Sequence, residues 1–189
     1  RRFAVFALLA AILTSGSMIA AMYSVHIITI LQANGLTLAA AVGLGALVGP
    51  SQVGARIVER LAGTRHHPIW TLFAASLLVA AGLVVLVLAP AVPAVALIAY
   101  GAGNGIWSIA RGTLPLTVFG ASGYAVLMGR LATPSLVAQA VSPSIGALLM
   151  QAFGASTTLS VLGAMAACNV AGVGVLWIVL RSRASAEAR

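Results

Sequence analysis

Charge is what this sequence has least of. Only 6% of its 189 residues are charged, whereas a soluble globular domain carries roughly 25%. Its 10 basic residues are all arginine, lysine is absent, and there are 2 acids. So few polar groups cannot cover the surface of a soluble fold of this size. We therefore expect lipid to surround most of the chain.

Cysteine is almost absent too, which excludes two further classes of structure. The single Cys168 cannot form an internal disulfide or a cysteine metal cluster. It falls within an apolar run, so we interpret it as a packing residue. The tandem His66 and His67 has no third ligand nearby in the sequence, and we interpret it as a water-exposed turn. The sequence predicts no metal site and no cofactor.

Long apolar runs are what the sequence has instead, since 61% of its residues are hydrophobic. A helix needs about 20 mostly apolar residues to cross a bilayer. Turn signals divide the chain into six such spans, and the connectors are short and rich in Gly, Pro, Asn and Ser. No segment alternates apolar and polar residues as a membrane β-barrel would. We predict an all-α membrane protein, one bundle over residues 1–189, with spans at about 3–33, 38–58, 69–89, 94–116, 125–150 and 157–180.

The first span follows Arg1 and Arg2 and has no initiator methionine before it. The chain is therefore expected to be a fragment, a processed product or a shortened form. The apolar run from Phe3 is too long for a signal-peptide core and lacks a convincing cleavage site. We expect it to be a span.

The arginines fall at alternate ends of the spans. The connectors after the first, third and fifth spans carry no charge, and every charged residue lies toward one face if the chain crosses six times. The positive-inside rule makes that face cytoplasmic, with both termini inside and residues 181–189 as a cytoplasmic tail of a multi-pass inner-membrane protein. We expect no nucleic acid as a partner, because the arginines lie between apolar runs and form no water-facing basic patch.

Small residues and prolines predict how the spans pack. Glycine-rich stretches allow close helix contacts, and Pro50, Pro134 and Pro143 are expected to kink their helices. Spans one, two, four and five are expected to form the packed or cavity-lining set. The bulky third span and the sixth are expected at the periphery. Two groups of three spans, each ending in a peripheral helix, are typical of an inverted 3+3 repeat.

Polar residues at membrane depth are the candidates for a substrate pathway, because they are costly there. His26, beside Tyr23, is either an interfacial histidine paired with its surroundings or a contact for substrate or protons. Asn104 either closes a tight glycine contact by an interhelical hydrogen bond or faces a pathway. Arg111 either extends to the interface or binds anionic groups of a substrate. Gln139 either lines a cavity or bonds to a neighbouring helix.

No set of residues supports catalysis. The acids Glu59 and Glu187 both fall toward the expected cytoplasmic side, so no paired-carboxylate site can form. No nucleophile and base can be placed face to face within the spans. We do not expect an enzyme.

The connector after the second span carries the one motif with a family pattern. In "ARIVERLAGTRH" Glu59 precedes Arg60, Gly63 follows at the turn, and Arg65 is a later basic residue. With the span number and sidedness, this run resembles the C-terminal six-helix half of a major facilitator superfamily transporter. The chain departs from the family pattern because Ala55 replaces a strict glycine, with Gly54 one residue earlier, and an extra residue precedes Gly63.

The resemblance implies secondary active transport of a small solute by alternating access. It implies proton coupling and an N-terminal six-helix half as partner. It also implies a cytoplasmic gating motif, here Gly54, Arg56, Glu59, Arg60, Gly63 and Arg65. Glu59 would accept hydrogen bonds from a helix N-terminus in the other half. Two alternatives stay open: these charges only fix topology, or the chain is a self-contained six-helix protein acting as a homodimer or as an assembly subunit.

Overall fold

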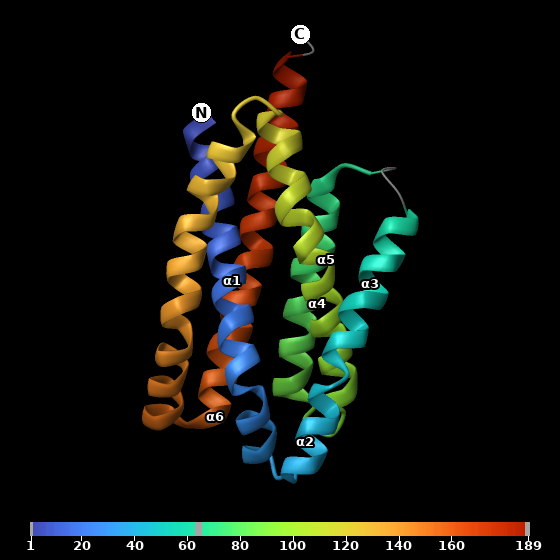
Figure 1. The fold of residues 1–189 in the computed structure, drawn as a ribbon, viewed down its shortest axis with the longest axis vertical. Helices are drawn as coiled ribbons and strands as arrows, with labels where there is room; N and C mark the ends of the chain where they lie inside the picture. The colour runs from blue at the N-terminus through green and yellow to red at the C-terminus, as the bar shows by residue number, and fades with distance from the viewer. Residues whose placement is uncertain (1, 63–65, 188–189) are drawn as a thin grey trace.

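The protein is seen here in a computed structural model, which describes residues 2–62 and 66–187. All regular structure in these residues is helical, and no strand occurs among them. The all-α prediction is therefore confirmed for the described chain. The helices are α1 (Arg2–Ala33), α2 (Leu38–Gly45), α3 (Val48–Ala62), α4 (Pro68–Leu88), α5 (Pro93–Phe119) and α6 (Tyr124–Glu187) (Figure 1).

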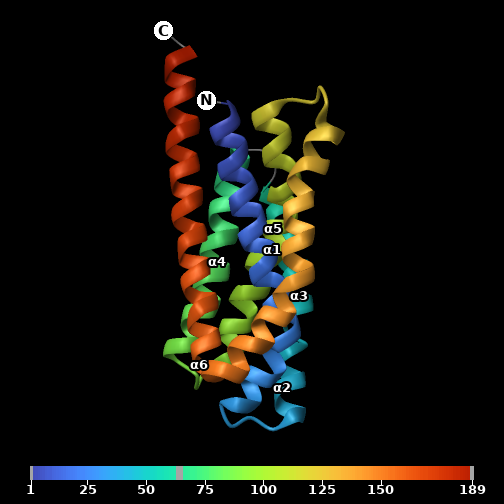
Figure 2. The same ribbon diagram turned by 90° about the vertical axis from the view of Figure 1, so that its left-hand side faces the viewer.

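The long helix α6 is two helices that meet at Gly154. Gly154 has φ 80° and ψ 171°, a backbone conformation outside the helical region that suits only glycine. The chain reverses there, so a first arm (residues 124–153) and a second arm (residues 155–187) run in opposite directions, with α1 between them (Figures 1 and 2). As a result α1 begins and α6 ends at the same end of the bundle.

One of the three prolines expected to kink a helix lies next to a helix break, and the other two do not. The break between α2 and α3 falls at Ala46 and Leu47, one turn before Pro50, which has no N–H to offer the Ala46 carbonyl. Leu47 N bonds instead to Leu44 O at 2.9 Å, as in a tighter turn. By contrast, the first arm of α6 stays helical across Pro134 and Pro143.

Four segments are long and apolar enough to cross a membrane: Phe3–Ala33, Leu38–Ala62, Pro68–Leu88 and Tyr124–Ser182. This finding supports a membrane protein by length and composition. The last segment contains both arms of α6, and α5 is not among the four. The number of passes and the side on which the ends lie stay predictions.

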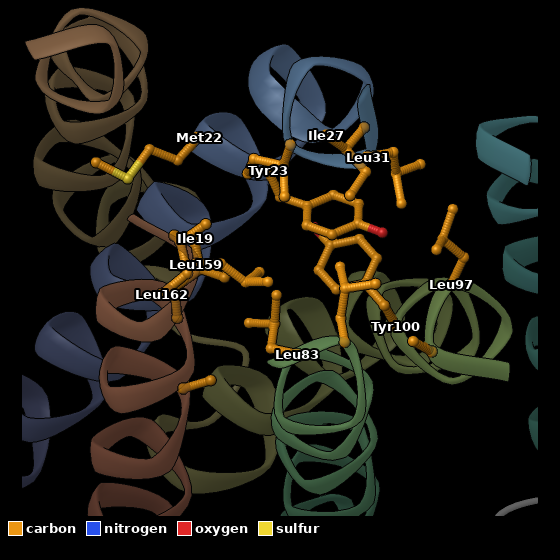
Figure 3. Close-up of a cluster of buried hydrophobic side chains, with 14 of the residues drawn as sticks. Ile19, Met22, Tyr23, Ile27, Leu31, Leu83, Leu97, Tyr100, Leu159 and Leu162 are labelled. Atoms are coloured by element: carbon orange, nitrogen blue, oxygen red, sulfur yellow. The ribbon is translucent and has the colours of Figure 1, made fainter. Parts of the chain in front are cut away.

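The helices enclose two clusters of buried apolar side chains. One contains Leu9, Leu72 and Leu114 and lies toward the end where α1 begins. The other surrounds Tyr23 and Tyr100, whose rings stack with centroids 3.6 Å apart (Figure 3). Together the clusters fasten α1, α4, α5 and the second arm of α6 into the centre of the bundle.

The expectations that the third and the sixth span lie at the periphery are wrong, and the sixth span, in the second arm of α6, contributes to both buried clusters. α4 has nine buried residues, with Leu72, Ala75 and Leu83 fully buried, whereas α3, in the expected packed set, has none. Bulky apolar side chains do not distinguish the two environments, because lipid tails are as apolar as leucine. What buries α4 is its close fit to α5, where a Cβ on Gly82 would lie 2.6 Å from the Ala96 carbonyl.

Candidate functional site

A polar hollow of about 290 Å³ lies among α1, α3, α5 and the first arm of α6. We refer to it as the central hollow. It brings together three predicted pathway residues, Asn104, Arg111 and Gln139, with one residue of the gating motif, Arg56. Its complete lining is Ser17, Ala20, Ala21, Ser24, Arg56, Asn104, Trp107, Ser108, Arg111 and Gln139.

Helical periodicity explains why these residues meet. Asn104, Trp107, Ser108 and Arg111 follow the spacing i, i+3, i+4 and i+7 on α5, so they share one face. The lining residues of α1, from Ser17 to Ser24, follow the same spacing. Each helix therefore offers one stripe of small or polar side chains to the hollow.

Glycines on α5 set how closely α3 approaches the hollow. A Cβ on Gly101 would lie 2.8 Å from the Val48 carbonyl oxygen, and one on Gly105 would lie 2.8 Å from Gln52 Cα. Such distances leave no room for a side chain, so the α3 and α5 backbones are nearly in contact here. Because the two helices are so close, Arg56 Nε can donate a hydrogen bond to Gly105 O at 3.3 Å.

The central hollow is cationic and rich in hydrogen-bonding groups. Arg56 and Arg111 both line it, and neither Glu59 nor any other acid is among its lining residues. Across the described residues, the ion pair recorded for Glu59 goes to His66 and not to these arginines. The Asn104 and Gln139 amides also face the hollow. The hollow thus holds two guanidinium groups and two amides without an internal counter-ion.

A second hollow of about 570 Å³ adjoins the first through Arg56 and contains the contact between Glu59 and His66. Thr71 donates a 2.6 Å hydrogen bond to Glu59 Oε1, and His66 Nε2 lies 3.1 Å from the same oxygen. A carboxylate only accepts, so His66 carries its proton on Nε2 in this contact. Thr71 lies in the first turn of α4, whose dipole also favours a carboxylate.

Within the described chain, Glu59 has partners that the sequence did not predict. Thr71 belongs to α4, and His66 lies just before that helix. The further partner in another half that the family resemblance implied stays a prediction. Arg60 is exposed and lines the second hollow. Gly54 has open space around it, so it makes no close helix contact. Gly63 and Arg65 lie outside the described residues.

The remaining predicted pathway residues, Tyr23 and His26, do not line the central hollow. His26 Nε2 donates to Pro143 O at 2.9 Å, and a Cβ on Gly146 would lie 2.6 Å from its ring. His26 therefore joins α1 to the first arm of α6. Tyr23 is buried against Tyr100 (Figure 3), and neither hydroxyl has a hydrogen-bond partner in the part of the chain that the structure describes.

Sequence reasoning missed several lining residues and one buried contact. Ser17, Ser24, Trp107 and Ser108 line the central hollow. Helical spacing in the sequence already placed Trp107 and Ser108 on one face with the predicted residues of α5. The buried contact joins three helices. Asn169 Nδ2 donates to Ile12 O at 2.8 Å, and Ser76 Oγ donates to Asn169 Oδ1 at 3.1 Å.

Comparison with known proteins gave no match: no protein-family model, no curated protein and no solved structure matches this chain. The resemblance to the major facilitator superfamily therefore rests on the motif around Glu59, the order of the apolar runs and their charges. It stays a prediction.

Proposed function

We propose that this chain is the C-terminal six-helix half of a twelve-helix secondary transporter of the major facilitator type. It crosses the inner membrane six times, with both ends in the cytoplasm, and moves a small solute by alternating access. The observation that carries the proposal is the central hollow, a polar and open space within an otherwise apolar bundle.

The depth of the hollow supports this role. Ser17 lies midway along α1, Asn104 midway along α5 and Gln139 midway along the first arm of α6. In transporters built from repeats, the substrate site lies near the middle of the membrane between discontinuous or bent helices. Polar groups at that depth are costly unless they face water or a solute. The central hollow supplies such a place.

The faces beside the hollow support a missing second half. α3 exposes Val53, Ile57 and Leu61, and the first arm of α6 exposes Leu136 and Val141. These two elements flank the central hollow, so a second bundle laid against them would close it. A second copy of this chain is the alternative occupant, which is the homodimer hypothesis.

Proton coupling belongs to the proposal through the family resemblance. The lining of the central hollow contains no carboxylate and no histidine. A proton-binding carboxylate is therefore assigned to the other half. Glu59, held by Thr71 at the start of α4, is assigned to a cytoplasmic gate.

The experiment is to identify the polypeptide that carries this sequence in its native membrane. An affinity tag at the C-terminus of that polypeptide allows it to be purified and its mass and coding frame to be determined. The proposal expects a chain of about twice this length, with six more apolar spans upstream. A native polypeptide without such spans overturns it and favours the self-contained protein.

A further inference from the structure

We propose that the central hollow binds the anionic oxygen group, carboxylate or phosphate, of a small soluble solute between Arg56 and Arg111. This inference rests on the proposed function, because it names the class of solute that the pathway carries. It is argued from the charge, the donors and the size of the hollow.

The charge of the hollow excludes a cationic solute. Two guanidinium groups line it, and they come from different helices, Arg56 from α3 and Arg111 from α5. An arginine stays charged at any physiological pH. Since no acid is among the lining residues, the hollow has a net positive charge that an anion would balance.

The donors that remain on the arginines suit an anionic oxygen group. Arg56 Nε is already engaged by the Gly105 carbonyl, which fixes the guanidinium and leaves its terminal NH₂ groups for a ligand. Arg111 has no hydrogen bond to another described residue, so all N–H groups of its guanidinium are available to a ligand. Guanidinium forks match the paired oxygens of carboxylates and phosphates.

The rest of the lining limits the size of the solute. The Asn104 and Gln139 amides add donors and acceptors, and Trp107 supplies an aromatic wall. A volume of about 290 Å³ lies at the lower end of the range for ligand pockets, roughly 300 Å³ upward. The site therefore fits a small organic anion, with its charged group between the arginines and its apolar part near Trp107.

The test uses Trp107 as a reporter inside the hollow. Trp70 and Trp177, which contact each other with ring centroids 5.3 Å apart and do not line the hollow, are replaced by Phe. The 189-residue chain is placed in phosphatidylcholine nanodiscs at constant ionic strength. Trp107 fluorescence is then quenched with iodide, with caesium and with neutral acrylamide.

We expect iodide to quench Trp107 several times more strongly than caesium, each relative to free tryptophan. Arg56→Gln and Arg111→Gln should each reduce the iodide quenching by at least about twofold and leave acrylamide quenching unchanged. Arg130→Gln is the matched control, because it removes the same charge from a residue that does not line the hollow. Equal quenching by iodide and caesium overturns the proposal, and so does an iodide excess that survives both substitutions.

Competition then identifies the source of the anionic group. Benzoate or inorganic phosphate should suppress the iodide quenching, whereas benzamide, the neutral analogue of benzoate, should not. If phosphatidylglycerol in the nanodisc suppresses the quenching and soluble anions do not, the site belongs to lipid headgroups and the proposal is wrong.

A second measurement keeps the test valid if the tryptophan substitutions impair folding. The unmodified chain should gain thermal stability with benzoate and not with benzamide, and Arg111→Gln should abolish the gain. No difference between benzoate and benzamide contradicts the proposal. None of these readouts needs the second half or transport. The mass and coding frame of the native polypeptide test the half-transporter independently.

Discussion

At the scale of single residues, polar side chains in this bundle divide into two groups. Some bond to another helix: His26 to Pro143, Thr71 to Glu59 and Asn169 to Ile12. Others, such as Asn104 and Gln139, face the central hollow. The hydrogen-bonded side chains hold neighbouring helices in position. The side chains that face the hollow can contact a solute. The sequence places His26, Asn104 and Gln139 at membrane depth but does not say which group each joins, because partner and cavity depend on how the helices pack.

Thr71 should contribute measurably to stability through Glu59. Thr71→Val keeps the shape and removes the 2.6 Å hydrogen bond to the carboxylate. We expect a loss of about 1–2 kcal/mol in the free energy of unfolding, as for hydrogen bonds to charged groups. The measurement is denaturation in mixed micelles with increasing SDS.

Thr113→Val provides the control for Thr71. Thr113 also lines the second hollow, but its hydroxyl bonds to Ile109 O of its own helix and it is exposed. Its substitution should change stability by less than about 0.5 kcal/mol. Equal effects of the two substitutions would show that the hydrogen bond to Glu59 adds nothing to the free energy of unfolding.

Asn169 should hold three helices together. Asn169→Ala removes the bonds to Ile12 O and from Ser76, and leaves both partners buried. Because interhelical side-chain bonds in membrane proteins average about 0.6 kcal/mol each, we expect a loss of roughly 1–2 kcal/mol in the same SDS titration. Gln151→Ala, on the exposed side of α6, should have almost no effect. A loss no larger than that of Gln151→Ala would contradict a structural role for Asn169.

At the scale of helices, the sequence predicts bounds well and packing poorly. The predicted runs 69–89 and 94–116 differ from α4 (Pro68–Leu88) and α5 (Pro93–Phe119) by only a few residues at each end. Turn residues and the length of apolar runs determine those ends locally. Whether a face contacts protein or lipid is not local, and this is why α4 was expected at the periphery and is buried. The glycines of α5 were recognised as contact residues, but their partners on α3 and α4 were not.

The glycine face of α5 should be intolerant of even a methyl group. In Gly105→Ala the new Cβ would lie 2.8 Å from Gln52 Cα, so α3 must move away. We expect a loss of about 1–3 kcal/mol, as for other overpacked contacts, measured by thermal unfolding in detergent.

Gly112→Ala on the same helix is the control. Its nearest atom beyond the local backbone is the Tyr124 hydroxyl oxygen at 4.0 Å, and alanine favours helix over glycine. The control should be neutral or stabilising. If Gly105→Ala unfolds at the same temperature as Gly112→Ala, the two backbones are not in close contact.

At the scale of the whole molecule, the central hollow is open and the elements beside it are apolar and exposed. α3 has no buried residue, although it carries Arg56 and flanks the hollow. A complete transporter would cover this side with its other bundle. In a homodimer a second copy would cover it. The central claim is that this chain supplies one half of a solute pathway. Two copies of it are not expected to form a working transporter.

The most direct test is the copy number of the isolated 189-residue chain in nanodiscs, measured by native mass, together with benzoate uptake into proteoliposomes. The half-transporter predicts one copy per disc and uptake no faster than in protein-free liposomes. Two copies in a stable complex, with saturable benzoate uptake, would contradict it.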